Sequence, residues 1–408
     1  MRKVSFIWIF LIVLFSCKNS ETTGLKEGIW LAQLEVQDKE VLPFNFKLMK
    51  TDENKYGLEM YNADEVIRVN DVWVEHDSIK IKMDVYEGYI IGRFTENEIK
   101  GEFIKESLDR IVPFTATYGT DERFPVAHAP IANVSGVWET EFSPNTEESY
   151  MAKGIFEQMG NKVVGTFRTT TGDYRYLEGV MDADSLKLSA FDGAHAFLFT
   201  AKVSDSSING TFYSGNHFKE PFLGKRNANY ELPDEDTLTY LNDGYDTFDF
   251  SFPDANGTMV SLEDERFKDK VVIVQIMGTW CPNCMDETKF YVDYLKKNST
   301  EELEFVALAF EYAKTPDAAF AGINRLKERI GIPYPILLAQ YGTSNKDKAQ
   351  EKLPMLNHVL SYPTSIFIDK KGTVRKIHTG FNGPATGEKF TVFKKEFHSF
   401  VTNLLEEQ

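Results

Sequence analysis

An internal repeat in the first half of the chain most constrains the fold. Residues 28 to 114 and 136 to 222 carry the same short segments in the same order. Each copy opens on Gly-x-Trp and later carries Asp-Ser-x-Lys and Pro-Phe, at 28–30, 77–80 and 113–114 in the first copy and at 136–138, 184–187 and 221–222 in the second. Alternating apolar and polar residues, with turn residues about every eight to twelve positions, predict antiparallel strands. We therefore expect two antiparallel all-β repeats, each a small barrel or a sandwich.

Length, composition, charge and cysteine count limit the number of domains, the class of protein and the kinds of partner. At about 150 residues per domain, 408 residues predict two or three domains. Hydrophobic residues make up 42% and charged residues 26%, which excludes a disordered or polytopic membrane chain. The net charge of -17 argues against nucleic acid as a partner. The three cysteines, Cys17, Cys281 and Cys284, are too few for a disulfide-held scaffold.

The N-terminus has the pattern of an export signal. Two basic residues, Arg2 and Lys3, precede an almost wholly apolar run from Val4 to Phe15. About 12 apolar residues span roughly 18 Å as a helix, which is short of the ~30 Å bilayer core, so we do not expect a permanent transmembrane anchor.

The end of this run, at residues 14–17, resembles the lipobox of bacterial lipoproteins. The resemblance implies cleavage before Cys17 and acylation of Cys17, which would hold the protein on a membrane. Lys18 then favours the outer membrane, so we expect a periplasm-facing lipoprotein of the cell envelope. A plain hydrophobic terminus and an ordinary secretory signal are the alternatives.

The C-terminal part follows a different pattern. From about residue 248, strand-like and helix-like segments alternate, which predicts an α/β domain. We divide the chain into a signal peptide at 1–17 with acylated Cys17, a tether at 18–26, β repeats at 27–120 and 134–226, an acidic linker at 227–246 and an α/β domain at 247–408.

The candidate chemistry lies at the end of an apolar run. Residues 270–277 predict a buried parallel strand, and Cys281-Pro282-Asn283-Cys284 follows almost directly. Because Pro282 suits the first turn of a helix, we expect a helix from there to about Lys297. Amides and the positive dipole end of that helix would favour the thiolate of Cys281. Lowering a thiol pKa from 8.5 to about 7 raises its ionised share from about 3% to half.

Cys281 is accordingly predicted as the nucleophile. Cys284, one turn further on, is within disulfide reach and can release the partner, so the pair would form a redox disulfide. A purely structural disulfide between near neighbours would constrain the unfolded chain little, and a zinc site lacks a second cysteine pair, so we expect no metal.

Residues 245–405 resemble the thioredoxin superfamily, specifically extracytoplasmic thiol:disulfide oxidoreductases of the TlpA/ResA type. The matching motifs are Trp-Cys-Pro-Asn-Cys at 280–284 and Ser-Tyr-Pro-Thr at 361–364. The resemblance implies an α/β thioredoxin fold in which Pro363 is the cis-proline facing the cysteine pair. It also implies substrate contacts from the flanking residues Trp280, Pro282, Tyr362 and Thr364.

The same resemblance gives Glu287 a role. Glu287 matches the acidic residue that this subgroup places near its cysteine pair, where it could exchange protons. A first-turn helix carboxylate without a catalytic role is the alternative. Gln275 stands where cytoplasmic thioredoxins carry a buried Asp.

We therefore expect a membrane-anchored thiol:disulfide oxidoreductase that acts on exported proteins, as a reductase, with no cofactor besides its redox-active disulfide. Its partners would be exported protein thiols or disulfides and an envelope electron donor. An oxidase or isomerase with the same site is the first alternative, because relatives of this fold span roughly 150 mV in potential. The second is an envelope lipoprotein whose β domains bind a ligand or partner.

Overall fold

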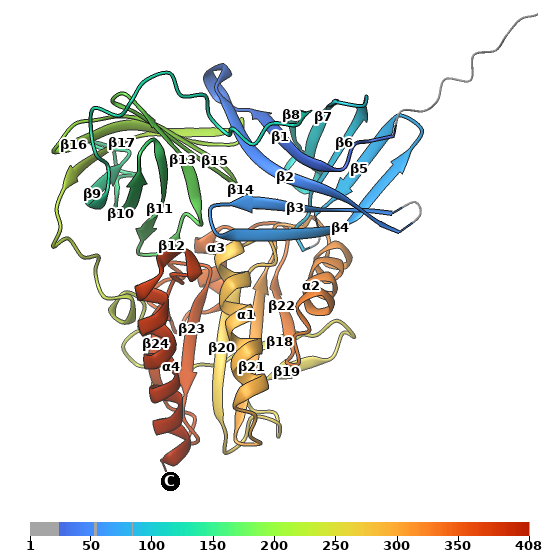
Figure 1. The fold of residues 1–408 in the computed structure, drawn as a ribbon. Helices are drawn as coiled ribbons and strands as arrows, with labels where there is room; N and C mark the ends of the chain where they lie inside the picture. The colour runs from blue at the N-terminus through green and yellow to red at the C-terminus, as the bar shows by residue number, and fades with distance from the viewer. Residues whose placement is uncertain (1–23, 53–54, 84, 408) are drawn as a thin grey trace, which may run out of the picture.

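The computed structural model describes residues 24–52, 55–83 and 85–407, which form two β-barrels followed by an α/β unit (Figure 1). The predicted signal segment, Cys17 and most of the predicted tether lie outside the described residues. In Figure 1 the two barrels lie beside one another, and the C-terminal unit lies below both.

The first barrel contains eight antiparallel strands, and β1 closes it by pairing with both β2 and β8. Its strands are β1 (Gly28–Glu35), β2 (Val41–Asp52), β3 (Lys55–Asn62), β4 (Glu65–Glu75), β5 (Ser78–Lys82), β6 (Tyr89–Phe94), β7 (Glu98–Lys105) and β8 (Arg110–Tyr118). Short 3-10 turns lie at η1 (Gln37–Lys39) and η2 (Glu106–Leu108). In β5, Ile79 and Ile81 are buried and their neighbours are exposed, which is the alternation that the sequence predicted.

The second barrel repeats this arrangement. Pairing of β10 with β11 closes a ring of eight strands, and the short strand β12 pairs with β11 at its edge. Its strands are β9 (Gly136–Phe142), β10 (Tyr150–Met159), β11 (Lys162–Thr169), β12 (Gly172–Asp173), β13 (Leu177–Asp182), β14 (Ser185–Phe191), β15 (Ala196–Val203), β16 (Ser207–Ser214) and β17 (Phe218–Arg226). The prediction of two antiparallel all-β units is confirmed, and both are barrels rather than sandwiches.

The repeated Gly-x-Trp segments have the same place in both barrels. Trp30 in β1 and Trp138 in β9 are fully buried, and each indole nitrogen donates to a carbonyl four residues earlier, at 3.0 and 2.8 Å. Aromatic rings pack against one another in the second barrel: Phe142 of β9 and Phe167 of β11 have ring centroids 5.3 Å apart. Side chains therefore occupy the interior of the second barrel, and closure leaves the eight strands of the ring without free edges.

The C-terminal unit is built on a mixed five-stranded sheet with the order β22-β21-β20-β23-β24. Its elements are β18 (Ser251–Pro253), β19 (Met259–Ser261), β20 (Val271–Met277), α1 (Pro282–Lys297), β21 (Leu303–Phe310), α2 (Pro316–Ile330), β22 (Ile336–Gln340), α3 (Lys346–Lys352), β23 (Thr364–Ile368), β24 (Val374–Thr379), η4 (Pro384–Thr386) and α4 (Glu388–Glu406). The central strand β20 is fully buried, as predicted, and is parallel to β21 but antiparallel to β23.

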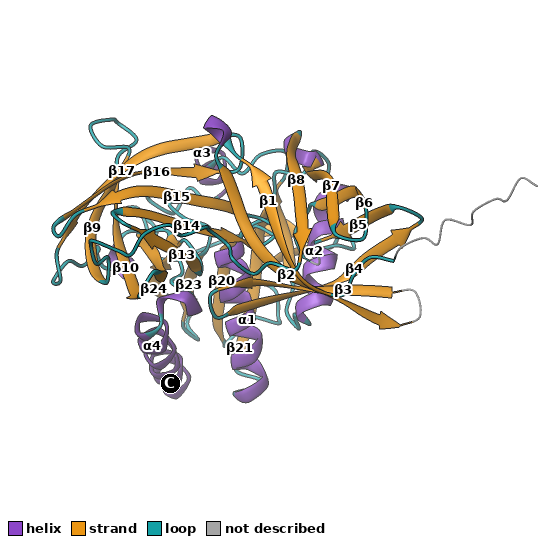
Figure 2. Ribbon diagram, turned by 45° about the horizontal axis from the view of Figure 1, so that its top comes forward, coloured by secondary structure: helices purple, strands orange, loops and turns teal. Residues whose placement is uncertain are grey.

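Helices α1 and α4 lie side by side against the sheet (Figure 1), and Phe290 of α1 packs against Phe397 of α4 with ring centroids 4.9 Å apart. Among the described residues, no helix is both long enough and apolar enough to cross a membrane. Figure 2 shows the longer helices at the C-terminal unit, while the barrels are formed mainly of strands and loops.

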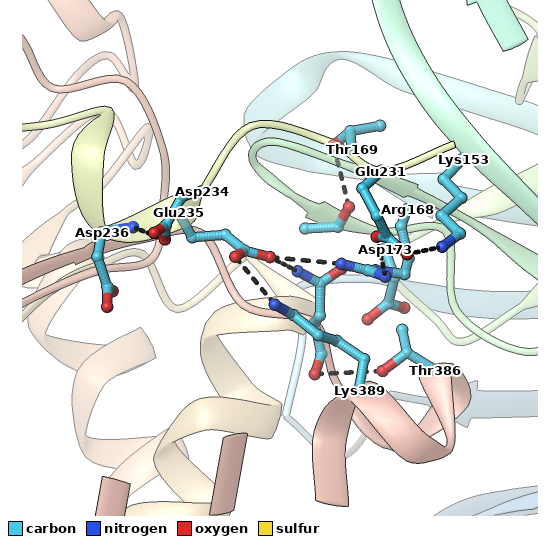
Figure 3. A network of polar contacts seen from close by, with 12 residues as sticks. Lys153, Arg168, Thr169, Asp173, Glu231, Asp234, Glu235, Asp236, Thr386 and Lys389 are labelled. Carbon is cyan, nitrogen blue, oxygen red and sulfur yellow. Dashed lines mark hydrogen bonds and ion pairs between the residues drawn. The ribbon is translucent and has the colours of Figure 1, made fainter. Parts of the chain in front are cut away.

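The predicted acidic linker packs between domains and contains the short turn η3 (Glu235–Thr237). The carboxylate of Glu235 accepts hydrogen bonds from Arg168 of the second barrel at 3.4 Å and from Lys389 of α4 at 3.0 Å (Figure 3). The linker therefore ties the second barrel to the C-terminal unit.

Candidate active site

Cys281 and Cys284 form a disulfide at the start of α1, with their Cα atoms 5.2 Å apart. Cys281 is the N-cap residue of α1, and Pro282 is its first helical residue, as the sequence predicted. The backbone N–H of Cys284 donates to the sulfur of Cys281 at 3.1 Å. In the reduced protein the same amide and the helix dipole would stabilise a Cys281 thiolate.

The cis peptide bond between Tyr362 and Pro363 lies beside the disulfide. The carbonyl oxygen of Tyr362 is 3.3 Å from the sulfur of Cys281, so the turn that the sequence indicated does face the cysteine pair. Trp280 packs against the Tyr362 ring with centroids 5.5 Å apart, and its indole donates to the carbonyl of Phe310 at 2.9 Å.

The other two expected substrate contacts lie further inside. Pro282 is buried in the first turn of α1, and Thr364 is buried at the start of β23. The hydroxyl of Thr364 donates to the carbonyl of Ser361 at 2.9 Å, so it holds the turn that contains Pro363. Of these four residues, Trp280 is the one whose side chain is partly exposed, while Tyr362 presents its backbone carbonyl to Cys281.

Glu287 lies in a buried hydrogen-bond network next to Cys284. Gln275 donates through Nε2 to Glu287 at 2.8 Å and to the backbone carbonyl of Cys284 at 3.3 Å. Ser365 donates to the other Glu287 oxygen at 3.0 Å. Burial raises the pKa of Glu287 to about 7, although both donors favour the charged form. A carboxyl group that can take up or release a proton near neutral pH therefore lies next to the resolving cysteine.

A second buried carboxyl group, that of Glu311, was not singled out from the sequence. Glu311 follows β21 and accepts hydrogen bonds from the backbone N–H and the hydroxyl of Thr279, at 2.7 and 2.8 Å. Burial raises its pKa to about 7. The signal that could have identified it is a charged residue directly after the apolar run 305–310.

The second barrel covers the cysteine pair. The carbonyl of Thr171, in the turn before β12, accepts from the hydroxyl of Ser361 at 2.9 Å. The carbonyl of Asp173 accepts from the side-chain amide of Asn283 at 3.2 Å. Cys281 is only 5% exposed and Cys284 is fully buried. Access to the disulfide in this arrangement is therefore limited by the turn at 170–173.

Glycine is required in this turn. Gly172 has a φ of +141°, and a Cβ atom there would come within 2.1 Å of the side-chain nitrogen of Asn283. The absence of a side chain lets the barrel approach the first turn of α1 closely.

One guanidinium group joins all three units near this turn. Arg175 forms ion pairs with Glu65 of the first barrel, with Asp192 after β14 at 3.6 Å, and with Asp286 of α1. All four side chains are largely buried. This cluster positions the barrels relative to the helix that carries Cys284.

Comparisons with known proteins agree with this geometry. The family model named Redoxin matches residues 244–391. The thioredoxin-like protein YneN of Bacillus subtilis is 29% identical over 140 residues, which is 34% of this chain and 73% of YneN. The thiol-disulfide oxidoreductase ResA of the same organism is 26% identical over 140 residues, which is 34% of this chain and 69% of ResA.

Solved structures that match the C-terminal part include a thiol:disulfide interchange protein of the thioredoxin family from Chlorobium tepidum TLS. It is 22% identical, with a TM-score of 0.30, and the match covers 40% of this chain and 99% of that one.

The Redoxin match contains both cysteines, Glu287 and Pro363. The unit that follows the two barrels is a thioredoxin-like domain that is similar to thiol-disulfide oxidoreductases of the ResA type, and the protein that carries it is a thioredoxin-like oxidoreductase.

Proposed function

We propose that this protein reduces disulfides of exported proteins through Cys281 and Cys284. The observation that carries the proposal is the disulfide at the N-terminus of α1, which faces the turn at Pro363. Thiol-disulfide exchange needs an ionisable thiol, a second thiol within bonding distance and a backbone surface for the partner, and these three features meet here.

In the proposed reaction, the reduced pair starts with Cys281 as thiolate. Its sulfur attacks one sulfur of the substrate disulfide, so a mixed disulfide forms and the first substrate thiolate leaves. Cys284 then loses its proton and attacks the sulfur of Cys281, which releases the second substrate thiolate. Two electrons have passed to the substrate, the proton of Cys284 has left the pair, and the two substrate thiolates take up protons from water according to their own pKa values. An envelope electron donor must then reduce the Cys281–Cys284 disulfide again.

Glu287 is the proposed acceptor of the proton from Cys284. Its pKa of about 7 suits a group that exchanges protons near neutral pH. Gln275 links the two residues because it donates both to the carboxylate of Glu287 and to the backbone carbonyl of Cys284. No cofactor other than the disulfide itself takes part in this scheme.

Substrate recognition is proposed to use the surface around Cys281. Trp280 and the backbone of Tyr362 would contact the partner chain directly. Pro282 and Thr364 are buried and would act by fixing the first turn of α1 and the turn at Pro363.

We further propose that the protein is a lipoprotein of the cell envelope, anchored through acylated Cys17 and facing the periplasm from the outer membrane. The support is the export-signal pattern at 1–17. Cys17→Ala should release the protein from membranes, and the mature mass should include the lipid. Membrane retention of this variant together with an unmodified mature mass would contradict the anchor.

The function is tested by trapping. Cys284→Ser removes the thiol that completes the exchange, so partners should accumulate as mixed disulfides on Cys281. The matched control Cys281→Ser should trap none. Trapped exported proteins that release on adding a small thiol would support the proposal. Equal recovery with both variants would refute it.

A further inference from the structure

A cavity of about 250 Å³ lies where both barrels meet the thioredoxin-like domain. The first barrel contributes residues of β7 and β8, and the second contributes residues around β15 and β16. Trp280 and Tyr312, whose rings pack with centroids 5.8 Å apart, form the wall on the third side. The cavity therefore borders the residue that directly precedes Cys281.

Basic side chains line this cavity. Lys105, Arg110, His195 and His217 all border it. Lys105 is only 7% exposed, and its ammonium group donates to the carbonyl of Ala194 at 3.0 Å. An ammonium group has three N–H donors, so two remain for a ligand. Within the described part of the chain, no carboxylate forms an ion pair with Lys105 or Arg110.

His195 pairs with Asp192 at 3.2 Å, so the cavity's uncompensated positive charge comes from Lys105 and Arg110. Burial, and then Arg110, lower the pKa of Lys105 to about 8, so it stays mostly protonated at pH 7. Burial, Arg110 and Lys105 lower the pKa of His217 to about 4. Asp192 and Glu87 act in the opposite direction on Lys105, but both carboxylates hold other partners. Buried charges are normally paired, so a bound anion would provide the counterion that the chain itself does not provide in this cavity.

We propose that this cavity binds a carboxylate group of the thiol or disulfide substrate, next to Trp280. The inference rests on the proposed function and names the substrate class: anionic thiols and disulfides. The cavity has room for roughly eight water molecules at about 30 Å³ each, which suits a carboxylate on a short chain or an acidic side chain of a peptide.

Two chromogenic disulfides, one dianionic and one neutral, test whether the cavity binds a carboxylate. The disulfide of thionitrobenzoate carries two carboxylates, and dithiodipyridine is neutral. Each is mixed with the reduced full-length protein, and the rate of chromophore release is followed. In Lys105→Met and in Arg110→Gln, the rate with the dianionic disulfide should fall roughly tenfold, as expected for loss of a hydrogen bond to a charged group. The rate with dithiodipyridine should stay within about twofold of wild type.

Lys47→Met is the matched control, because Lys47 is an exposed lysine of the same barrel outside the cavity. It should leave both rates unchanged. Isophthalate, a dicarboxylate without sulfur, should slow only the dianionic disulfide in the wild type. Because Arg110 is half-buried and at the cavity edge, Arg110→Gln keeps the test valid even where Lys105→Met fails to fold.

The two proposals fail in different ways. An unchanged ratio of the two rates in both variants, or an equal loss with both disulfides, would overturn the anion site while leaving the redox function in place. If neither compound oxidises the reduced pair of the wild type to the Cys281–Cys284 disulfide, the proposed function itself is overturned.

Discussion

Replacing Glu287 by Gln should make the stability of this protein less dependent on pH. The carboxyl group is fully buried, and its pKa rises from an ordinary 4.5 to about 7. The folded state therefore holds this proton more tightly than the unfolded state. Its contribution to stability is fully present below pH 4.5 and is lost as the pH rises through 7.

The size of the effect follows from the difference in pKa. The rise from 4.5 to about 7 corresponds to about 3 kcal/mol of stability at 1.36 kcal/mol per pKa unit. Most of that loss falls between pH 5 and pH 8. Gln has the same shape and no charge, so Glu287→Gln should be more stable relative to wild type at pH 8 than at pH 5 by about 2 kcal/mol.

Urea unfolding of the oxidised full-length protein at the two pH values measures this difference. Comparing variant and wild type at each pH cancels the titration of all other groups. Glu301→Gln, which alters an exposed carboxyl group, is the control and should give no difference between the two pH values. A stability difference for Glu287→Gln that is the same at pH 5 and pH 8 would show that Glu287 does not titrate as inferred.

Three further predictions concern the barrels and their contact with the site. Arg175→Met removes the guanidinium that three buried carboxylates share, among them Asp192, and should cost about 3 to 5 kcal/mol, measured by urea unfolding; a loss below about 1 kcal/mol would contradict the role of this cluster. Gly172→Val should push the turn away from Asn283 and speed alkylation of reduced Cys281 by iodoacetamide several-fold, whereas an unchanged rate would mean that the turn does not limit access. Trp138→Ala should destabilise the protein by about 3 to 5 kcal/mol in the same unfolding assay, and a smaller loss would mean that its site collapses around the missing ring.

Local patterns in the sequence were sufficient to predict much of the fold. Alternation of apolar and polar residues in segments such as 78–82 predicts strands, because successive side chains of a strand point to opposite faces of the sheet. The apolar run before Cys281 and the proline at position 282 fix where β20 ends and α1 begins. The repeat of Gly-x-Trp likewise predicts two similar units, although closure into barrels depends on pairing between distant strands.

Contacts between the units could not be predicted in this way. Arg175 meets Glu65 and Asp286 only because three separately folded units pack together, and no local pattern encodes that packing. The same holds for the turn at 170–173 over Asn283 and for the cavity that both Lys105 and Trp280 line. The pKa of Glu287 also depends on burial from several elements, so the sequence indicated its position but not its titration. The role of Cys17 stays a prediction.

The most direct test of the account is a redox titration of the full-length protein against a thiol-disulfide buffer, with the state of the two cysteines read by thiol-specific labelling and mass spectrometry. We expect Cys281 and Cys284 to gain and lose two electrons together, reversibly and with one midpoint. Independent reaction of the two thiols, or a disulfide that does not form again after reduction, would contradict the central claim.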